Sequence, residues 1–305
     1  MIKINAFTPN HQKELVEFIN SVNGSRDTPK ELTELFFEQG INIPPANPKT
    51  DCFLAYLNKE IYGFLQFIDE TPIKRLVGLH TIRSGPYFEE ILKSFLNLSI
   101  QRASKAEVEV INFQIPENDK ESSRIFETNG WKKIKTYRNL RFEGTDLEEL
   151  ILPDGYSVRH FDNRKDIDTL TKLQNISFGS HWGFSPNSKD QIQYRITMER
   201  TSDQGIIFIA NNNEIAGYNW TMQSHYGNSA VGWVAMTGVH PDYRGLKLGK
   251  AVVLAGMHYL ISQNVHVIEL EVDSENIPAT NLYESIGFKK VSETYWYQKK
   301  PSSTP

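Results

Sequence analysis

The sequence predicts a tandem α/β fold in which each half of the chain forms a mixed β-sheet flanked by helices. The chain has 305 residues, which is enough for two domains that each bury their own core. Each half shows the same order of patterns: a short strand, helical segments, a hairpin, a long strand, a helix, a strand, a helix and closing strands. Short segments of the first half also recur in the second, so we interpret the chain as an internal duplication.

The repeated segments occur in the same order in both halves and at a nearly constant shift. Between the halves, turn-forming and acidic residues interrupt the pattern from Glu143 to Gly155. We therefore predict an N-terminal domain over residues 1–145 and a C-terminal domain over residues 155–300. The matching segments are Glu127–Lys133 with Glu284–Lys290 (a shift of 157), Asn58–Phe64 with Asn212–Tyr218 (a shift of 154) and Gly24-Ser25 with Gly179-Ser180 (a shift of 155).

The composition is that of an ordinary globular protein, with 39% hydrophobic residues, 23% charged residues and a net charge of −4. This charge argues against a nucleic-acid partner. Residues Met1–Phe7 lack the apolar segment of a signal peptide, and the apolar stretch Ala251–Ile261 is too short to span a bilayer. We expect a cytoplasmic protein without membrane contact, and its oligomeric state stays open. The single cysteine, Cys52, excludes an internal disulfide and is predicted to be a buried, inert thiol.

A strand–loop–helix motif lies in the second half. A strand ends at Val239, a loop begins with Arg244-Gly245, and an apolar helix follows from Ala251. Such a turn directs several backbone N–H groups and the positive end of a helix dipole toward one point. The motif therefore predicts a pyrophosphate-binding loop.

A second motif, Asn276–Phe288, follows one strand later. The pair resembles the GNAT N-acetyltransferase superfamily, whose acetyl-CoA loop reads Arg/Gln-x-x-Gly-x-Gly/Ala and whose next helix reads Asn-x-x-Ala-x-x-Leu-Tyr-x-x-x-Gly-Phe. The resemblance implies the GNAT fold in both halves and acetyl-CoA as the acyl donor. The middle glycine of the family's loop is Lys247 here, so a positive φ at this position would cost about 1 kcal/mol more than in a glycine.

The resemblance also implies which residues would hold acetyl-CoA. Strand 230–239 should splay from strand 266–273, and the pantetheine arm would lie in the gap like an added strand. Asn276 is expected to cap the next helix and to meet a pantetheine amide, while Ala279 lets the arm pass and Asn281 faces it. The main chain of Thr237, Gly238 and Val239 would bind the pantetheine, and the pyrophosphate would lie in the loop formed by Arg244, Gly245, Leu246, Lys247, Leu248, Gly249 and Lys250.

Acetyl transfer to an amine needs a proton donor for the departing thiolate and a group that removes a proton from the amine. By resemblance, Tyr283 is the general acid; in isolation, a Leu-Tyr pair on a helix would indicate core packing. Many GNAT enzymes have a glutamate on the strand before the loop, where this chain has Trp233 and Met236. No spacing of Cys, His and Asp residues suggests a metal site.

The best candidate for the missing base is on the strand after the loop helix. Glu269, Glu271 and Asp273 alternate there and should face the same side. Glu271 is the first choice as a base or amine-holding group, and a solvated carboxylate face is the alternative. His181 and His225 are further candidates, although a histidine at either place is more often structural.

The tandem layout resembles the mycothiol synthase group of GNAT proteins, and so do Asn219-Trp220-Thr221 and Leu254–Leu260. The acceptor side departs from that group, because Met222, Trp233 and Glu271 stand at the matching positions. We expect an aromatic pocket for an apolar-bodied amine or a peptide N-terminus. This predicted pocket consists of Trp182, Trp220, Trp233 and His181.

The first half is expected to be a degenerate copy. It has Leu79–Pro86 in place of the phosphate loop and Phe126 in place of Tyr283, and a phenylalanine cannot exchange a proton. The leading hypothesis is therefore an N-acetyltransferase whose chemistry lies in the second half. A non-catalytic acyl-CoA-binding or regulatory module is the alternative, and the retained Tyr283 argues against it. A third hypothesis is a tandem GNAT acyltransferase with a longer acyl or an aminoacyl donor.

Overall fold

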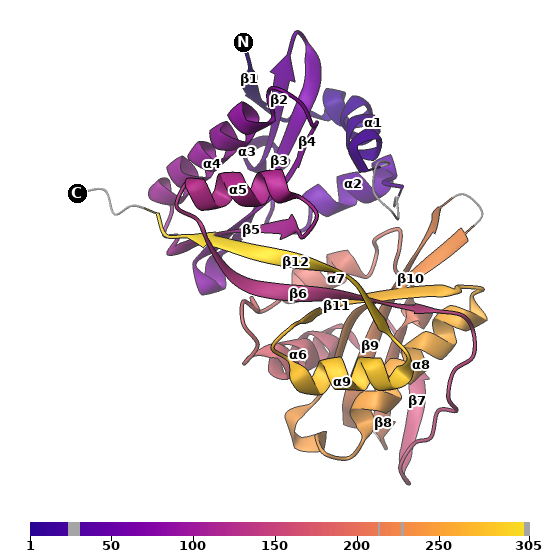
Figure 1. Cartoon of the computed structure of the whole chain (residues 1–305). Coiled ribbons are helices and arrows are strands. Elements are labelled where there is room, and N and C mark those ends of the chain that lie inside the picture. Colours follow the sequence, from indigo (N-terminus) through magenta and orange to yellow (C-terminus); the bar gives the residue numbers. More distant parts are fainter. Residues whose placement is uncertain (24–30, 213, 227–228, 302–305) are drawn as a thin grey trace. The chain divides into compact units, whose positions relative to one another are not determined.

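The computed structural model describes residues 1–23, 31–212, 214–226 and 229–301 (Figure 1). The chain divides into two compact units, Met1–Tyr137 with Glu293–Pro305 and Arg138–Ser292. The last residues of the chain thus belong with the first unit, and the residues just after Tyr137 belong with the second. The ranges 1–145 and 155–300 remain predictions for the extent of the two sequence copies.

The first unit contains a mixed sheet with the strand order β1-β2-β3-β4-β5-β12, in which β4 and β5 are parallel and the other neighbouring strands are antiparallel. Helices α1 and α2 cover one face and helices α4 and α5 the other (Figure 1). The elements are β1 (Lys3–Ala6), α1 (Gln12–Asn23), α2 (Glu34–Ile41), α3 (Pro48–Asp51), β2 (Cys52–Leu57), β3 (Glu60–Glu70), β4 (Arg75–Ile82), α4 (Phe88–Lys105), β5 (Val110–Pro116), α5 (Lys120–Thr128), β6 (Lys132–Glu143) and β12 (Lys289–Lys299).

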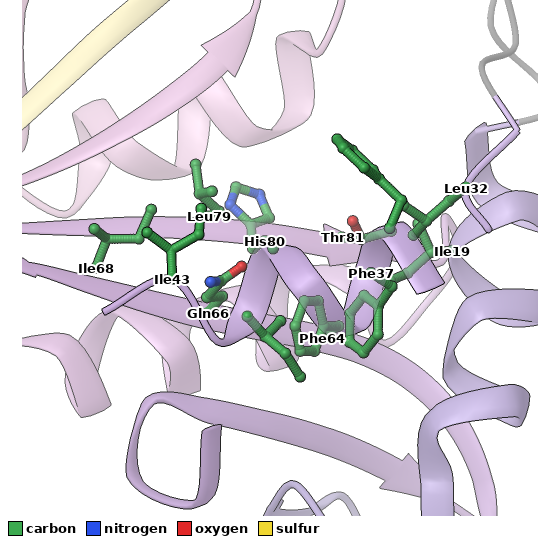
Figure 2. Close-up of a pocket in the computed structure, with 13 residues that line it drawn as sticks. Ile19, Leu32, Phe37, Ile43, Phe64, Gln66, Ile68, Leu79, His80 and Thr81 are labelled. Atoms are coloured by element: carbon green, nitrogen blue, oxygen red, sulfur yellow. The ribbon is translucent and has the colours of Figure 1, made fainter. Parts of the chain in front are cut away.

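A cavity of about 370 Å³ lies in the first unit between α2 and the sheet. Its lining is mostly apolar, and Gln66, His80 and Thr81 supply polar side chains. Figure 2 shows Phe37 and Phe64 close together at one end; their ring centroids are 5.7 Å apart. Cys52 lies in the neighbouring core, and burial raises the pKa of its thiol to about 12, as expected for the inert residue predicted from the sequence.

The second unit has the strand order β6-β11-β10-β9-β8-β7. Helices α8 and α9 pack on one face, and α6 and α7 pack on the other. Helix α8 is apolar on nearly all sides because the sheet and α9 enclose it. The elements are β7 (Tyr156–His160), α6 (Ile167–Phe178), α7 (Lys189–Arg195), β8 (Ile206–Asn211), β9 (Glu214–Tyr226), β10 (Ser229–Val239), α8 (Leu248–Ser262), β11 (Val267–Asp273) and α9 (Ile277–Ile286). Across the described residues, each helix is too short or too polar to cross a bilayer.

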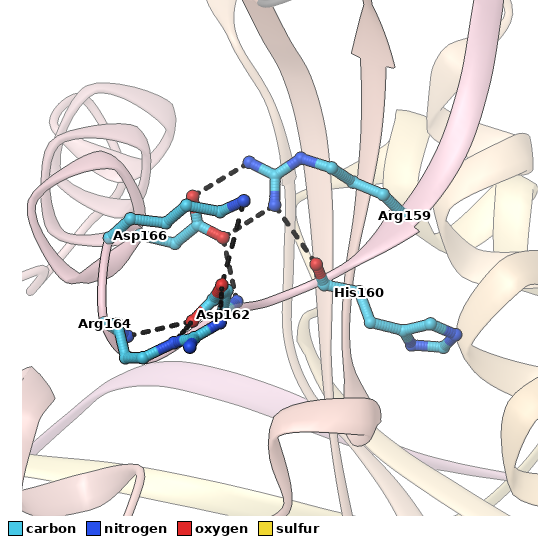
Figure 3. A network of polar contacts seen from close by, with 6 residues as sticks. Arg159, His160, Asp162, Arg164 and Asp166 are labelled. Carbon is cyan, nitrogen blue, oxygen red and sulfur yellow. Dashed lines mark hydrogen bonds and ion pairs between the residues drawn. The ribbon is translucent and has the colours of Figure 1, made fainter.

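A polar network fixes the start of α6 (Figure 3). Arg159 on β7 donates to both carboxylate oxygens of Asp166, at 2.6 and 2.9 Å, and the Asp162 amide donates to the same side chain at 2.8 Å. Burial by itself would raise the pKa of Asp166, but these hydrogen bonds outweigh it and lower the pKa. The ionised carboxylate is therefore the form that stabilises the fold.

We predict that Asp166→Ala destabilises the protein by about 2 kcal/mol at pH 7, because it leaves the Arg159 guanidinium without its partner. The folded-state pKa of Asp166 lies below its unfolded value. Its contribution is therefore complete above the unfolded pKa and disappears as the pH falls through the folded pKa. Urea denaturation at pH 7 and near pH 3 should show a smaller difference between variant and wild type at the lower pH. Asp168→Ala, which removes an exposed ion pair with Lys189, is the control and should change stability little at either pH.

Candidate active site

The central feature of the second unit is the divergence of β10 from β11. The two strands pair in parallel from Val231 with Val267 to Trp233 with Glu269. Beyond this point β10 continues along β9 as far as Val239, after a register shift between Val234 and Met236. Such a bulge increases local twist and bends a strand away from its neighbour. The splay that the sequence predicted is thus present.

The backbone alternation of β10 determines which groups face this gap. The His240 N–H donates to the Ala216 carbonyl at 2.8 Å, which fixes the phase of the antiparallel ladder with β9. By alternation, Gly238 also faces β9, whereas the N–H and C=O groups of Thr237 and Val239 face the gap. Thr237 and Val239 can therefore bind an extended ligand through their main chain. Gly238 contributes differently, since a Cβ there would lie only 2.9 Å from Ser177 Cβ.

The loop between β10 and α8 has the geometry of an anion-binding turn. Gly245 has φ +82° and Lys247 has φ +61°, so the left-handed conformation that we expected to be costly at Lys247 is present. Helix α8 begins at Leu248 without a side-chain cap. The N–H groups of its first turn are therefore available to an external acceptor, and the positive end of the helix dipole lies there. Leu248 itself is buried and anchors the turn, whereas Leu246 is exposed.

The cations of this loop differ in their surroundings. The Arg244 guanidinium donates to the Ser177 carbonyl at 3.0 Å and so binds the last turn of α6. The Lys250 ammonium pairs with both oxygens of Glu148, at 2.6 and 2.7 Å. Lys247 is exposed at the surface of the loop. Since its ammonium is paired, Lys250 can contribute mainly its backbone N–H to anion binding. Lys247 is the lysine whose ammonium is best placed to contact a phosphate.

Helix α9 lies beside this loop. Asn276 caps it as the sequence predicted, because its Oδ1 accepts from the Ala279 N–H at 3.2 Å. Asn281 is exposed, and Ala279 is half-buried. A Cβ on Gly249 at the start of α8 would lie 3.6 Å from Leu282 Cδ2 of α9. The start of α8 therefore packs against the middle of α9.

Tyr283 lies on the inner side of α9. Its ring packs edge-on against Phe288 with centroids 5.9 Å apart, and 8% of its surface is exposed. Burial raises the pKa of Tyr283 to about 12, so the phenol keeps its proton throughout the neutral range. The side chain can serve as a hydrogen-bond donor or acid and cannot serve as a base at neutral pH.

The carboxylates of β11 have different environments. Glu269 is 9% exposed and accepts from Arg141 at 2.8 and 3.1 Å and from the Trp233 indole at 3.2 Å. Glu271 is exposed, and Asp273 is half-buried at the end of the strand. The first carboxylate is therefore held in a structural ion pair at the point where β10 and β11 part. Glu271 is the one that solvent and a ligand can reach.

The residues predicted to form the acceptor pocket are distributed unevenly. Trp220 is buried in the core beneath α6 and α7, whereas Trp182 is half-buried. The Arg200 guanidinium lies over the ring of Trp233, 5.9 Å from its centroid. His181 is exposed and packs against Phe178. Desolvation, together with the positive charge of Arg244, lowers the pKa of His181, and the charge of Asp273 opposes this.

His181 is therefore near the phosphate loop and the end of β11. The side chain of His225 lies outside the described residues, as do Gly24-Ser25 and Asn213 of the repeated segments. Sequence reasoning did not identify Arg141 and Arg200 as part of this region. Arg141 lies 128 residues from Glu269 along the chain, and no local pattern connects the two.

The corresponding divergence of strands in the first unit, between β4 and β5, is occupied by different side chains. Strands β4 and β5 pair from Arg75 with Val110 to Gly78 with Phe113 and then diverge. Phe126 is fully buried there and contacts the rings of Phe113, Trp131 and Tyr297, while His80 stacks on it at 6.2 Å. Aromatic side chains thus occupy this region, and the degeneracy of the first half stays a prediction.

Comparison with known proteins identifies the class to which the second unit belongs. Residues 167–288 match the model of the acetyltransferase (GNAT) family. Mycothiol acetyltransferase from Arthrobacter sp. (strain FB24) is 28% identical over 176 residues, which cover 56% of this chain and 54% of that protein. The enzyme of the same name from Pseudarthrobacter chlorophenolicus is 30% identical over 148 residues, covering 48% of this chain and 46% of the relative. The chain spans about half the length of the curated relatives it matches.

Solved structures show that the likeness in fold extends over the whole chain. A tandem GNAT protein from the clavulanic acid biosynthesis pathway has a TM-score of 0.76 at 13% identity and covers 100% of both chains. A GCN5-related N-acetyltransferase from Sphaerobacter thermophilus has a TM-score of 0.73 at 14% identity, covering 98% of this chain and 96% of that chain. The chain has the tandem GNAT fold, and its second half matches the GNAT family model and is similar to the mycothiol acetyltransferases.

We predict that Lys247→Gly is more stable than Lys247→Ala by about 1 kcal/mol, because alanine retains the positive-φ strain and glycine does not. Both variants lose the ammonium group, so they should bind acetyl-CoA with equally reduced affinity. Urea denaturation measures the first effect, and calorimetric titration measures the second. Equal stability of the two variants would show that the loop adjusts its backbone when Lys247 is replaced.

Proposed function

We propose that this chain is an acetyl-CoA-dependent N-acetyltransferase that acts on a primary amine of a small molecule or a peptide, with its chemistry in the second unit. The observation that carries the proposal is one continuous path: the gap beside Thr237 and Val239 leads into the uncapped start of α8. An extended thioester ligand with a pyrophosphate needs both features in this order. The likeness to acetyltransferases supports the same reading.

The residues present fit acetyl-CoA. Thr237 and Val239 offer main-chain groups for the pantetheine amides, and Asn276 stands at the start of the neighbouring helix. The turn around Gly245 and Lys247 offers N–H groups for the pyrophosphate. When bound, acetyl-CoA supplies an activated acetyl thioester, and the protein must orient it, stabilise charge on its carbonyl oxygen and protonate the departing sulfur.

Tyr283 is the proposed acid. Its raised pKa keeps the proton on the phenol until a thiolate develops beside it. Because the folded-state pKa is about 12, the acid form is complete at neutral pH and would be lost only as the pH rises through that value. An alkaline decline of activity between pH 8 and 10 is therefore not expected from this group.

We predict that Tyr283→Phe lowers kcat by about 10²- to 10³-fold and leaves the affinity for acetyl-CoA nearly unchanged. The ring still fills its place against Phe288, so the melting temperature should hold. Thiol release from acetyl-CoA in the presence of an amine panel measures the rate. A variant that turns over at the wild-type rate would exclude Tyr283 as the acid.

Glu271 is the proposed amine-holding or proton-accepting group. It is exposed on β11, whereas Glu269 on the same strand is committed to Arg141. We predict that Glu271→Gln raises KM for the amine by about fivefold, because a solvent-screened carboxylate–ammonium contact is worth about 1 kcal/mol. Glu275→Gln, beyond the end of the strand, is the control and should leave KM unchanged. Unchanged KM in Glu271→Gln for every amine tested would remove the assignment.

A non-catalytic acyl-CoA-binding module is the second candidate, and one observation favours it. Strand β10 carries no carboxylate between Ser229 and Val239, and the buried Glu269 is tied to Arg141. Titration of acetyl-CoA into the wild type and into Gly249→Trp, which obstructs the start of α8, separates the hypotheses. Binding of one equivalent that the variant abolishes, without amine-stimulated thiol release, would favour the binding module. Amine-stimulated release would favour the enzyme.

A further inference from the structure

Two buried hydroxyl groups lie on the α6 face of the second sheet, beside the gap between β10 and β11. Within the described part of the chain, neither the Tyr218 hydroxyl nor the Ser177 hydroxyl has a hydrogen-bond partner, and the Tyr218 side chain is 0% exposed. A buried hydroxyl without a partner is unfavourable, so its retention needs an explanation. The function proposed above uses neither group.

Gly238 shows how these hydroxyls are placed. Tyr218 on β9 is the cross-strand partner of Gly238 on β10, so both residues direct their Cβ positions to the same face. A Cβ on Gly238 would lie 3.1 Å from Tyr218 Cε1 and 3.1 Å from Ser177 Oγ. The Tyr218 ring therefore occupies the space over the Gly238 backbone that a side chain would fill.

The Tyr218 hydroxyl reaches toward the gap. A tyrosine side chain is longer than the spacing of about 4.8 Å between neighbouring strands, so a ring that lies over Gly238 is long enough to direct its hydroxyl toward the far side of β10. Electrostatics agree with this placement. Burial raises the pKa of Tyr218 well above its usual value, and the electrostatic interaction with Tyr283 raises it further, so the two phenols lie within electrostatic range of each other.

The chemistry of such a group is restricted. A buried phenol with a raised pKa stays neutral, so it donates a hydrogen bond and does not accept a proton. The gap beside Thr237 and Val239 is where the proposed function places the pantetheine and its thioester. A fixed O–H donor at this place is suited to the negative charge that develops on a carbonyl oxygen during acyl transfer.

We propose that the Tyr218 hydroxyl donates a hydrogen bond to the carbonyl oxygen of the bound acetyl thioester and stabilises the charge that develops there. This inference rests on the proposed acetyl transfer. The amine nitrogen forms a bond to the carbonyl carbon, and the π electron pair of the C=O bond moves to the oxygen. The Tyr218 hydroxyl donates a hydrogen bond to this negatively charged oxygen and keeps its own proton. The C=O bond then re-forms as the C–S bond breaks. The sulfur takes the Tyr283 proton, and the surplus amine proton passes through water to Tyr283, which restores the acid.

Tyr218→Phe tests this assignment. We expect kcat to fall about 10²- to 10³-fold, while KM for acetyl-CoA stays within about threefold. The melting temperature should stay the same or rise, because the removed hydroxyl has no partner to lose. Tyr297→Phe is the matched control: this buried tyrosine in the first unit donates to Glu127 at 2.9 Å. It should lower the melting temperature and leave kcat unchanged.

A spectroscopic measurement makes the test independent of the acceptor. The infrared band of a ¹³C-labelled acetyl carbonyl in bound acetyl-CoA should lie at lower frequency in the wild type than in Tyr218→Phe. An equal carbonyl frequency in the two proteins would overturn the role of Tyr218 and leave the proposed function standing. An unchanged kcat in the variant, with a wild type that turns over, would do the same. If acetyl-CoA does not bind to the wild type, the proposed function fails, and the assignment of Tyr218 fails with it.

Discussion

The loss of a strand partner along the second half of β10 is the constraint on which the site depends. In a sheet, each central strand satisfies its N–H and C=O groups on both sides, and a buried backbone group without a partner is unfavourable. Pairing between β10 and β11 ends at Trp233 and Glu269, and the groups of Thr237 and Val239 then face a gap. An extended amide ligand can supply the missing hydrogen bonds as an added strand would. The uncapped start of α8 adds to this effect, because the N–H groups of its first turn have no partners in the helix and can also bind the ligand.

The gap persists because its closed end is fixed. Glu269 accepts from both Arg141 and the Trp233 indole, and this buried arrangement occurs at the last paired residues. Removing one member would leave an uncompensated buried charge, which costs several kcal/mol. The bulge after Val234 then turns β10 away, and α8 and α9 pack along the diverging strands. The ion pair is therefore best understood as a structural part of the site, which leaves Glu271 as the accessible carboxylate of this strand.

The sequence predicted the features of the site that depend on local chemistry. The Asn276 cap and the turn at Lys247 each follow from residues within a few positions of one another, so a single segment contains the information, whereas the splay of β10 followed from the resemblance to the GNAT family. Features set by distant residues could not be predicted in this way. Lys250 forms an ion pair with Glu148, which lies 102 residues away in the chain, and no charge pattern in the sequence predicts that contact. Trp220, expected in a pocket, lies in the core, since its strand position and not its residue type determines burial.

The two units also show how one backbone arrangement can be completed in two ways. In each unit a glycine lies on the strand that diverges, Gly78 on β4 and Gly238 on β10. In the first unit, a Cβ on Gly78 would meet the Phe113 ring at 2.2 Å, and Phe126 packs against that ring in an apolar cluster. In the second unit, the space over Gly238 is taken by Tyr218, whose hydroxyl finds no partner in the described part of the chain. A buried donor without a partner becomes favourable when a polar ligand supplies an acceptor. The proposed acyl-CoA site would therefore account for a tyrosine at this place, because its hydroxyl would gain a partner only when the gap is occupied.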